Sequence, residues 1–259
     1  LGVIARVGLE VAGQVIRVRK ECRDIIRTLG GKVIHPVMGL PGGVSRGMSE
    51  EERERFLETA HFAVEFAQFA LQIFDDVVLK NQAYVDAILS DTFCHQTYYM
   101  GMVDENNRVN FYDGRVRVVD PAGNEIARFA PRAYVDHIRE HVEPWSYVTF
   151  PYLKAVGWKG FVDGADSGVY RVAPLARLNV ADGMATPLAQ QAYDRMYETL
   201  GGKPVHATLA THWARLIEAL YAAERMVELL EDSEITSDHI RNVPTDVPEE
   251  GVGIVEAPR

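Results

Sequence analysis

Three residues, His137, Glu140 and His141, have a spacing that could support catalysis. A His-x-x-Glu-His pattern is found in one class of zinc peptidases, in which the two histidines bind the metal. The three residues lie in a stretch, 131–142, that reads as a helix, so both histidines are expected on one face. No third ligand can be identified, and a solvated charged face is the plainer interpretation. A zinc hydrolase that uses these residues therefore stays an alternative.

Arg259 is a second candidate, because it follows Ala257 and Pro258 after an apolar run, residues 251–255. The planar guanidinium group of arginine stays charged and donates several hydrogen bonds, which suits it to hold an anionic group. An arginine at a chain end is, taken by itself, usually an exposed charge. A functional role for Arg259 therefore depends on the rest of the sequence.

The loop at residues 30–44 is apolar and rich in glycine, and it contains His35. Ordinary surface loops are polar, so this composition indicates close packing of the backbone. One interpretation is a buried crossover. The other is the wall of a binding site, with His35 as a hydrogen-bonding or proton-carrying group.

The two cysteines, Cys22 and Cys94, lie far apart and form no Cys-x-x-Cys pair. Cys22 falls on an apolar helical stripe and is interpreted as a small core residue. Cys94 and His95 could bind a metal only with partners elsewhere in the chain. No metal ligands are therefore predicted within this chain.

The elements that must position these residues are mainly helical. Ser49 and Glu52 form a capping box that opens a long helix. Glu218 and Glu224, on the last long helix, are interpreted as solvent-facing residues. Helices are predicted at about 1–29, 50–80, 83–89, 131–142, 186–201 and 205–230, and strands at 97–103, 108–112, 115–119 and 125–129.

These elements predict a mainly α (α+β) fold, in which a long-helix bundle carries a small antiparallel β-sheet insertion. We expect a single domain over residues 1–259, with the insertion at residues 93–130. The net charge of −10 argues against nucleic-acid binding, and no apolar run is long enough to span a membrane. Few cysteines and no signal-peptide pattern indicate the cytoplasm. The chain begins with Leu1, so we expect it to be a fragment.

Several segments, in their order along the chain, resemble the large, catalytic subunit of nickel–iron hydrogenases. The resemblance is greatest to the cytoplasmic, bidirectional group that works with nicotinamide or F420-type partners, and it covers almost the whole chain. Each motif is short, but the ordered set is fairly specific. The matching segments are LGGKVIHPV (29–37), PGGV (41–44), SEEER (49–53), EHVEPWSY (140–147), GVYRVAPLARLN (168–179), ARLIE (214–218) and EAPR (256–259).

The resemblance implies reversible oxidation of dihydrogen to protons and electrons at a nickel–iron centre. In the family, four cysteines from two Cys-x-x-Cys motifs hold this centre, and neither motif is present here. The chain is therefore expected to be a central fragment that is inactive by itself. The resemblance places Arg259 over the metal centre as the catalytic candidate, with Ala257, Pro258 and His35 lining the site.

The resemblance also implies partners. Electrons would leave through iron–sulfur clusters in a small subunit and pass through diaphorase-type subunits to a nicotinamide-type acceptor, or to F420 or ferredoxin. A second alternative is the quinone-reductase (respiratory complex I) subunit of the same ancestry, which has no metal. The His35-Pro36 context and the glycine-rich loop favour the hydrogenase.

Overall fold

The computed structural model describes residues 2–243, 245–246 and 248–255. The chain forms two compact units, Leu1–Asp76 with Ala219–Glu249, and Val77–Glu218 with Glu250–Arg259. Helix α7 (Thr211–Glu231) contributes its second half to the first unit and its first half to the second. The expectation of a single domain over residues 1–259 stays a prediction.

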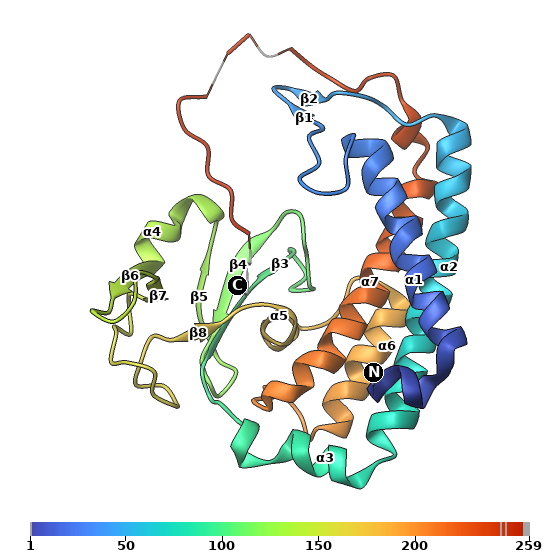
Figure 1. Cartoon of the computed structure of the whole chain (residues 1–259). Helices are drawn as coiled ribbons and strands as arrows, with labels where there is room; N and C mark the ends of the chain where they lie inside the picture. The colour runs from blue at the N-terminus through green and yellow to red at the C-terminus, as the bar shows by residue number, and fades with distance from the viewer. Residues whose placement is uncertain (1, 244, 247, 256–259) are drawn as a thin grey trace. The chain divides into compact units, whose positions relative to one another are not determined.

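The first unit is built on α1 (Gly2–Gly30), α2 (Glu50–Phe74) and the second half of α7 (Figure 1). The predicted capping box opens α2: the Ser49 hydroxyl accepts from the Glu52 amide at 3.2 Å, and the Ser49 amide donates to the Glu52 carboxylate at 3.1 Å. A π-helix, Asp75–Leu79, follows α2. The predicted long helix from residue 50 is thus confirmed, and the helix predicted at 1–29 is found with a break at Gly8, where φ is 89° and ψ is 165°.

The core of this unit lies between the three helices. Phe56 and Ala60 of α2 are buried against Leu230 of α7, and Ile25 and Leu29 of α1 pack on the same cluster. This packing uses one face of α1, as the apolar spacing predicts. Cys22 lies half-buried on α1, where burial raises the pKa of its thiol.

The apolar loop after α1 is not buried, contrary to one interpretation of its composition. It holds a short hairpin of β1 (Gly39–Leu40) and β2 (Gly43–Val44), and the side chains of Ile34 and Val37 are exposed. The predicted close packing is made by backbone instead. A Cβ on Gly43 would lie 2.2 Å from the Ile240 carbonyl oxygen, which accepts a 3.0 Å hydrogen bond from the amide of Val44.

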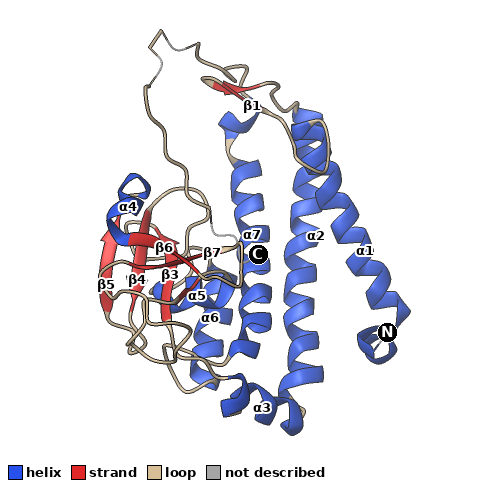
Figure 2. Ribbon diagram, turned by 60° about the vertical axis from the view of Figure 1, so that its left-hand side comes forward, coloured by secondary structure: helices blue, strands red, loops and turns tan. Residues whose placement is uncertain are grey.

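The second unit contains a four-stranded sheet with the order β5-β4-β3-β8, of which Figure 2 labels β5, β4 and β3. Its strands are β3 (Tyr98–Val103), β4 (Arg115–Val119), β5 (Glu125–Phe129) and the short β8 (Tyr170–Arg171). β3, β4 and β5 form the predicted antiparallel meander, and β8 pairs parallel to β3. Tyr98, Met100, Val116, Val118, Phe129 and Leu153 form its buried core.

The strand predicted at residues 108–112 is wrong, because this segment makes only two isolated bridges, Val109 with Val103 and Arg108 with Gly183, and then bends. A polar side chain just before this segment binds backbone amides that would otherwise be available to pair with a neighbouring strand. The Asp104 carboxylate accepts from the amides of Asn106 and Arg108, both at 2.8 Å, which favours a turn over a ladder.

The helix predicted at residues 131–142 is also wrong. Only α4 (Tyr134–His137) is an α-helix, after a 3₁₀ turn at Pro131–Ala133, and the chain then continues as β6 (Ile138–Val142). β6 pairs with β7 (Thr149–Leu153), with Ile138 opposite Leu153 and Val142 opposite Thr149. This long-range pairing overrides a local pattern that fits a helix.

The remaining helices of the second unit are α3 (Gln82–Leu89), α5 (Pro174–Val180), α6 (Pro187–Thr199) and the first half of α7. α3 and α6 match their predictions, whereas α7 begins six residues later than expected, after a 3₁₀ turn at Thr208–Ala210. Helix α5 was not predicted, although Pro174 at its first position is a common start signal. Within the described residues, no helix has both the length and the hydropathy needed to cross a membrane. The predicted mainly α fold with small sheets is confirmed.

Candidate functional site

A buried ion pair lies beside the sheet of the second unit. Arg177 of α5 donates from Nε and Nη2 to the two carboxylate oxygens of Glu218, at 2.6 and 2.8 Å. Only 15% of the Arg177 side chain and 8% of the Glu218 side chain are exposed. The interpretation of Glu218 as a solvent-facing residue is therefore wrong, because this face of α7 is covered and Arg177 neutralises the carboxylate. Glu224 is buried as well.

Helix α5 can approach the sheet closely because β3 contains Gly101. A Cβ at this position would lie 2.8 Å from the Val180 side chain and 3.0 Å from the Arg177 Cα. A Cβ at these distances would force the Val180 side chain and the α5 backbone to shift, so glycine lets α5 pack directly on β3. The Arg177 guanidinium also lies 5.2 Å from the centre of the Phe111 ring.

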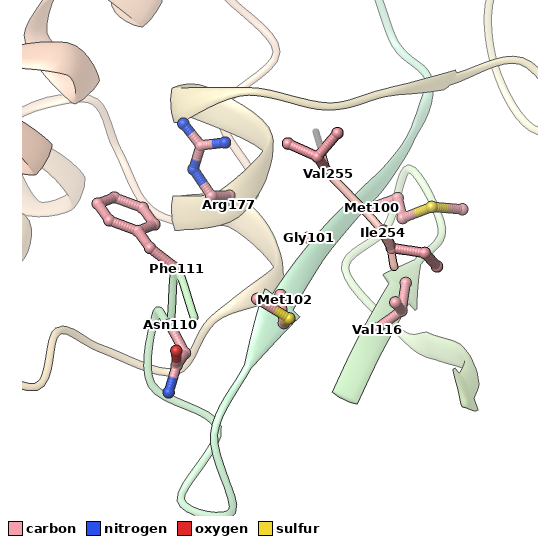
Figure 3. A pocket seen from close by; sticks show the side chains of 9 residues that line it. All are labelled: Met100, Gly101, Met102, Asn110, Phe111, Val116, Arg177, Ile254 and Val255. Carbon is pink, nitrogen blue, oxygen red and sulfur yellow. The ribbon is translucent and has the colours of Figure 1, made fainter. Parts of the chain in front are cut away.

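Arg177 lines a small cavity of about 160 Å³. Figure 3 shows Arg177 and Phe111 on one side of it, and Met100 and Val116 on the other. Ile254 and Val255 complete the cavity, and Ile254 also packs against the core of the sheet. These two residues are the last described part of the chain. The segment that leads to Arg259 is thus seated between β3 and α5.

The carboxyl end of α5 is held by a buried polar network. Asn179 accepts from the Tyr197 hydroxyl at 2.9 Å and from the Val205 amide at 3.0 Å. The Ala181 carbonyl accepts from the Tyr193 hydroxyl at 2.8 Å and from Lys203. Burial lowers the pKa of Lys203 to about 8 and raises the pKa of Tyr193 well above its usual value. The network fixes α5, and with it Arg177.

A second polar cluster contains two histidines. His95 bonds to Asp163, and Tyr99 places its hydroxyl 2.6 Å from Nδ1 of His206. Burial lowers the pKa of His206, which favours the neutral ring, and the same Tyr99 hydroxyl lies 3.2 Å from the Val205 carbonyl oxygen. Arg171 donates to the backbone carbonyls of both histidines, which ties the two ends of the cluster together.

The structure separates the residues of the predicted zinc motif. The His137 ring stacks on Phe129 with ring centres 4.1 Å apart, and the His141 ring stacks on Trp158 at 4.5 Å. Glu140 and His141 are neighbours on a strand, so their side chains point to opposite faces. The shared helical face on which the zinc interpretation depends is not formed.

The other predicted site residues are not brought together by the described part of the chain. His35 is exposed and has a positive φ of 52°. Ala257, Pro258 and Arg259 lie outside the described residues. Cys22 belongs to the first unit and Cys94 to the second. Among the described residues, no group of three histidine, cysteine or carboxylate side chains could hold a metal ion.

Residues 13–259 match the family model described as nickel-dependent hydrogenase. The chain belongs to the nickel-dependent hydrogenase family. It is 46% identical over 259 residues to an F420-non-reducing hydrogenase iron-sulfur subunit of Archaeoglobus profundus, a match that covers 100% of this chain and 53% of the relative. It is 36% identical to the NAD-reducing hydrogenase HoxS subunit beta of Cupriavidus necator, which covers 96% of this chain and 51% of the relative.

A solved hydrogenase has a similar fold. The crystal structure of an NAD⁺-reducing [NiFe]-hydrogenase in the H2-reduced state matches with a TM-score of 0.85 and 32% identity, over 98% of this chain and 54% of that chain. The chain thus spans about half the length of the hydrogenases it matches. The family predicted from the ordered motifs is confirmed, and it is favoured over the quinone-reductase and zinc-hydrolase alternatives.

The sequence motifs did not single out Arg177 and Glu218. Both lie in segments, 168–179 and 214–218, that carry the resemblance, and the available signal in the sequence was an arginine within an apolar segment. Its partner could not be identified, because Glu218 is 41 residues away along the chain.

Proposed function

We propose that this chain is the central part of the large, catalytic subunit of a nickel–iron hydrogenase. In the whole protein it would take part in the reversible oxidation of dihydrogen to protons and electrons. The observation that carries the proposal is the family match over residues 13–259, which the fold match at a TM-score of 0.85 supports.

The residues of this chain do not fit the role of metal ligands. The two cysteines lie in different units, and the described residues offer no group of three suitable donors. The ligands of a nickel–iron centre would therefore come from the part of the relatives' length that this chain does not span. We expect the 259-residue chain alone to be inactive.

The contribution that we assign to this chain is a positively charged group beside the reaction site. Arg259 would hold anionic ligands of the centre through its guanidinium group, and Ala257 and Pro258 would line the same pocket. Ile254 and Val255, seated on β3 and α5, support this role because they anchor the preceding backbone. His35 is proposed as a further lining residue.

The proposed partners are a small subunit with iron–sulfur clusters and diaphorase-type subunits, in the cytoplasm. Both relatives are named as single subunits of larger hydrogenases, which supports an assembly of several chains. We propose a nicotinamide-type acceptor because one relative is named NAD-reducing. F420 and ferredoxin are the alternatives, although relatives named F420-non-reducing weigh against F420.

The test compares two preparations for metal content and for hydrogen-dependent reduction of NAD⁺, F420 and ferredoxin. One is the 259-residue chain, and the other is the longer protein co-expressed with its partner subunits. We expect nickel, iron and NAD⁺ reduction only in the second. An Arg259→Lys variant of the longer protein should lose most activity while keeping its metal, whereas an Arg241→Lys variant should not. Stoichiometric nickel with hydrogen uptake in the chain alone, or no hydrogen oxidation by the complex, would refute the proposal.

A further inference from the structure

One side of α1 carries a dense row of positive charge, which we call the basic stripe: Arg19, Lys20, Arg23 and Arg27. All four residues are exposed, and together with Ile16 and Asp24 they line a surface hollow of about 420 Å³. Arg19, Arg23 and Arg27 recur at steps of four, so they lie above one another on the helix surface.

The helix itself neutralises only part of this charge. Arg27 pairs with Asp24 at 3.0 Å. Within the described residues, Arg19, Lys20 and Arg23 make no ion pair. Like charges four residues apart destabilise a helix, so the arrangement gains nothing for the folding of α1. The concentration of cations is also unusual in a chain with a net charge of −10.

The basic stripe lies on the side of α1 that faces away from the core of the first unit. Ile25 and Leu29, on the opposite side of α1, pack against the cluster of Phe56 and Leu230. Apolar side chains extend the exposed side instead: Leu9 is 82% exposed and Ile16, seven residues later, is 69% exposed. A surface that combines two apolar anchors with a row of arginines has the composition of a protein interface.

We propose that the basic stripe, with Leu9 and Ile16, is the docking surface for an acidic, amphipathic face of a partner subunit. The inference rests on the proposed function in that it requires an assembly of several subunits. Complementary charge supplies the main argument, because the partner's carboxylates would neutralise Arg19 and Arg23. Nucleic acid is disfavoured by the chain's net charge and by the carboxylate of Asp24 within the hollow.

The first test measures binding of a labelled acidic helical peptide, with leucines seven residues apart and glutamates on the turns between them. We expect binding that weakens with salt and that fails when glutamine replaces the glutamates. The variant R19Q/R23Q should bind about three- to tenfold more weakly, since each lost exposed pair has a modest effect. The control R108Q/R115Q removes two exposed arginines from the second unit and should bind normally. Equal binding by both variants would overturn the proposal.

The second test identifies the occupant in the assembled complex. A carbodiimide joins a lysine amine to a carboxylate in direct contact, so Lys20 reports what covers the stripe. A cross-link from Lys20 to another subunit supports the proposal. A cross-link from Lys20 to a segment of the same polypeptide outside α1 overturns it, whereas a local link to Asp24 of the same hollow counts as background. Stripe-dependent binding to anionic lipid vesicles or to duplex DNA, without binding to the peptide, also overturns the proposal. Neither test uses hydrogen turnover, so a failed docking proposal is distinguishable from a failed hydrogenase assignment.

Discussion

Replacing Glu218 by glutamine should strongly destabilise the second unit, because it removes the carboxylate that accepts two hydrogen bonds from the buried guanidinium group of Arg177. Both side chains are covered, with 15% of Arg177 and 8% of Glu218 exposed. Removing one partner of a buried pair typically costs about 3–5 kcal/mol. Glutamine keeps the size and one acceptor, so the lower end, about 3 kcal/mol, is expected. For a unit of this size that corresponds to a melting temperature lower by roughly 6–12 °C.

The matched control is Arg128→Gln, which removes a pair of the same chemistry at the surface. Arg128 bonds to Glu125, and 28% and 34% of these side chains are exposed. An exposed pair contributes less than about 1 kcal/mol, so this variant should unfold almost normally. Urea and thermal unfolding, followed by circular dichroism and fluorescence, would measure both.

A double variant separates the loss of charge balance from the loss of packing. Arg177→Met with Glu218→Leu replaces both charges by apolar groups, and such replacements are often close to neutral. We therefore expect the double variant to be more stable than Glu218→Gln alone. If Glu218→Gln is no less stable than the Arg128→Gln control, the ion pair does not hold α5 and this reasoning fails.

Two other perturbations test the surroundings of α5. Gly101→Ala would place a Cβ 2.8 Å from Val180 and should lower stability by about 1–3 kcal/mol, measured by urea unfolding, whereas a wild-type midpoint would show that α5 does not pack on β3 as described. Lys203 has a folded-state pKa of about 8, below its usual value of 10.5, so the unfolded chain binds more protons between these values. Stability should therefore rise as the pH increases from 8 toward 10, relative to Lys203→Met, and parallel pH profiles for the two proteins would contradict the burial of this amine.

Local chemistry made the first long helices and the meander predictable. The capping box at Ser49 fixes the start of α2 by short-range hydrogen bonds, and the strands of the meander are short runs rich in Val, Tyr and Phe that are separated by turn residues. Such features depend on residues a few positions apart, so a single sequence contains the information.

Residues 138–142 and the Arg177–Glu218 pair could not be predicted in the same way. A His-x-x-Glu-His run fits a helix locally, but pairing with residues 149–153 makes it a strand. Glu218 has ordinary helical neighbours, and only α5, brought in from 41 residues away, makes it a buried ion. In both cases the decisive partner is distant along the chain, and local patterns cannot identify it.

The contact between the first hairpin and the chain near Ile240 has a consequence for synthesis. The Val44 amide bonds to the Ile240 carbonyl, and the Asn242 amide bonds to the Gly42 carbonyl, so the first unit includes partners almost 200 residues apart. Its core also requires Leu230. The ribosome adds the residues between α2 and this segment at about 5–20 per second. For roughly ten to thirty seconds, the apolar faces of α1 and α2 that later contact Leu230 therefore remain exposed. We therefore expect the nascent chain to bind a ribosome-associated chaperone during this interval.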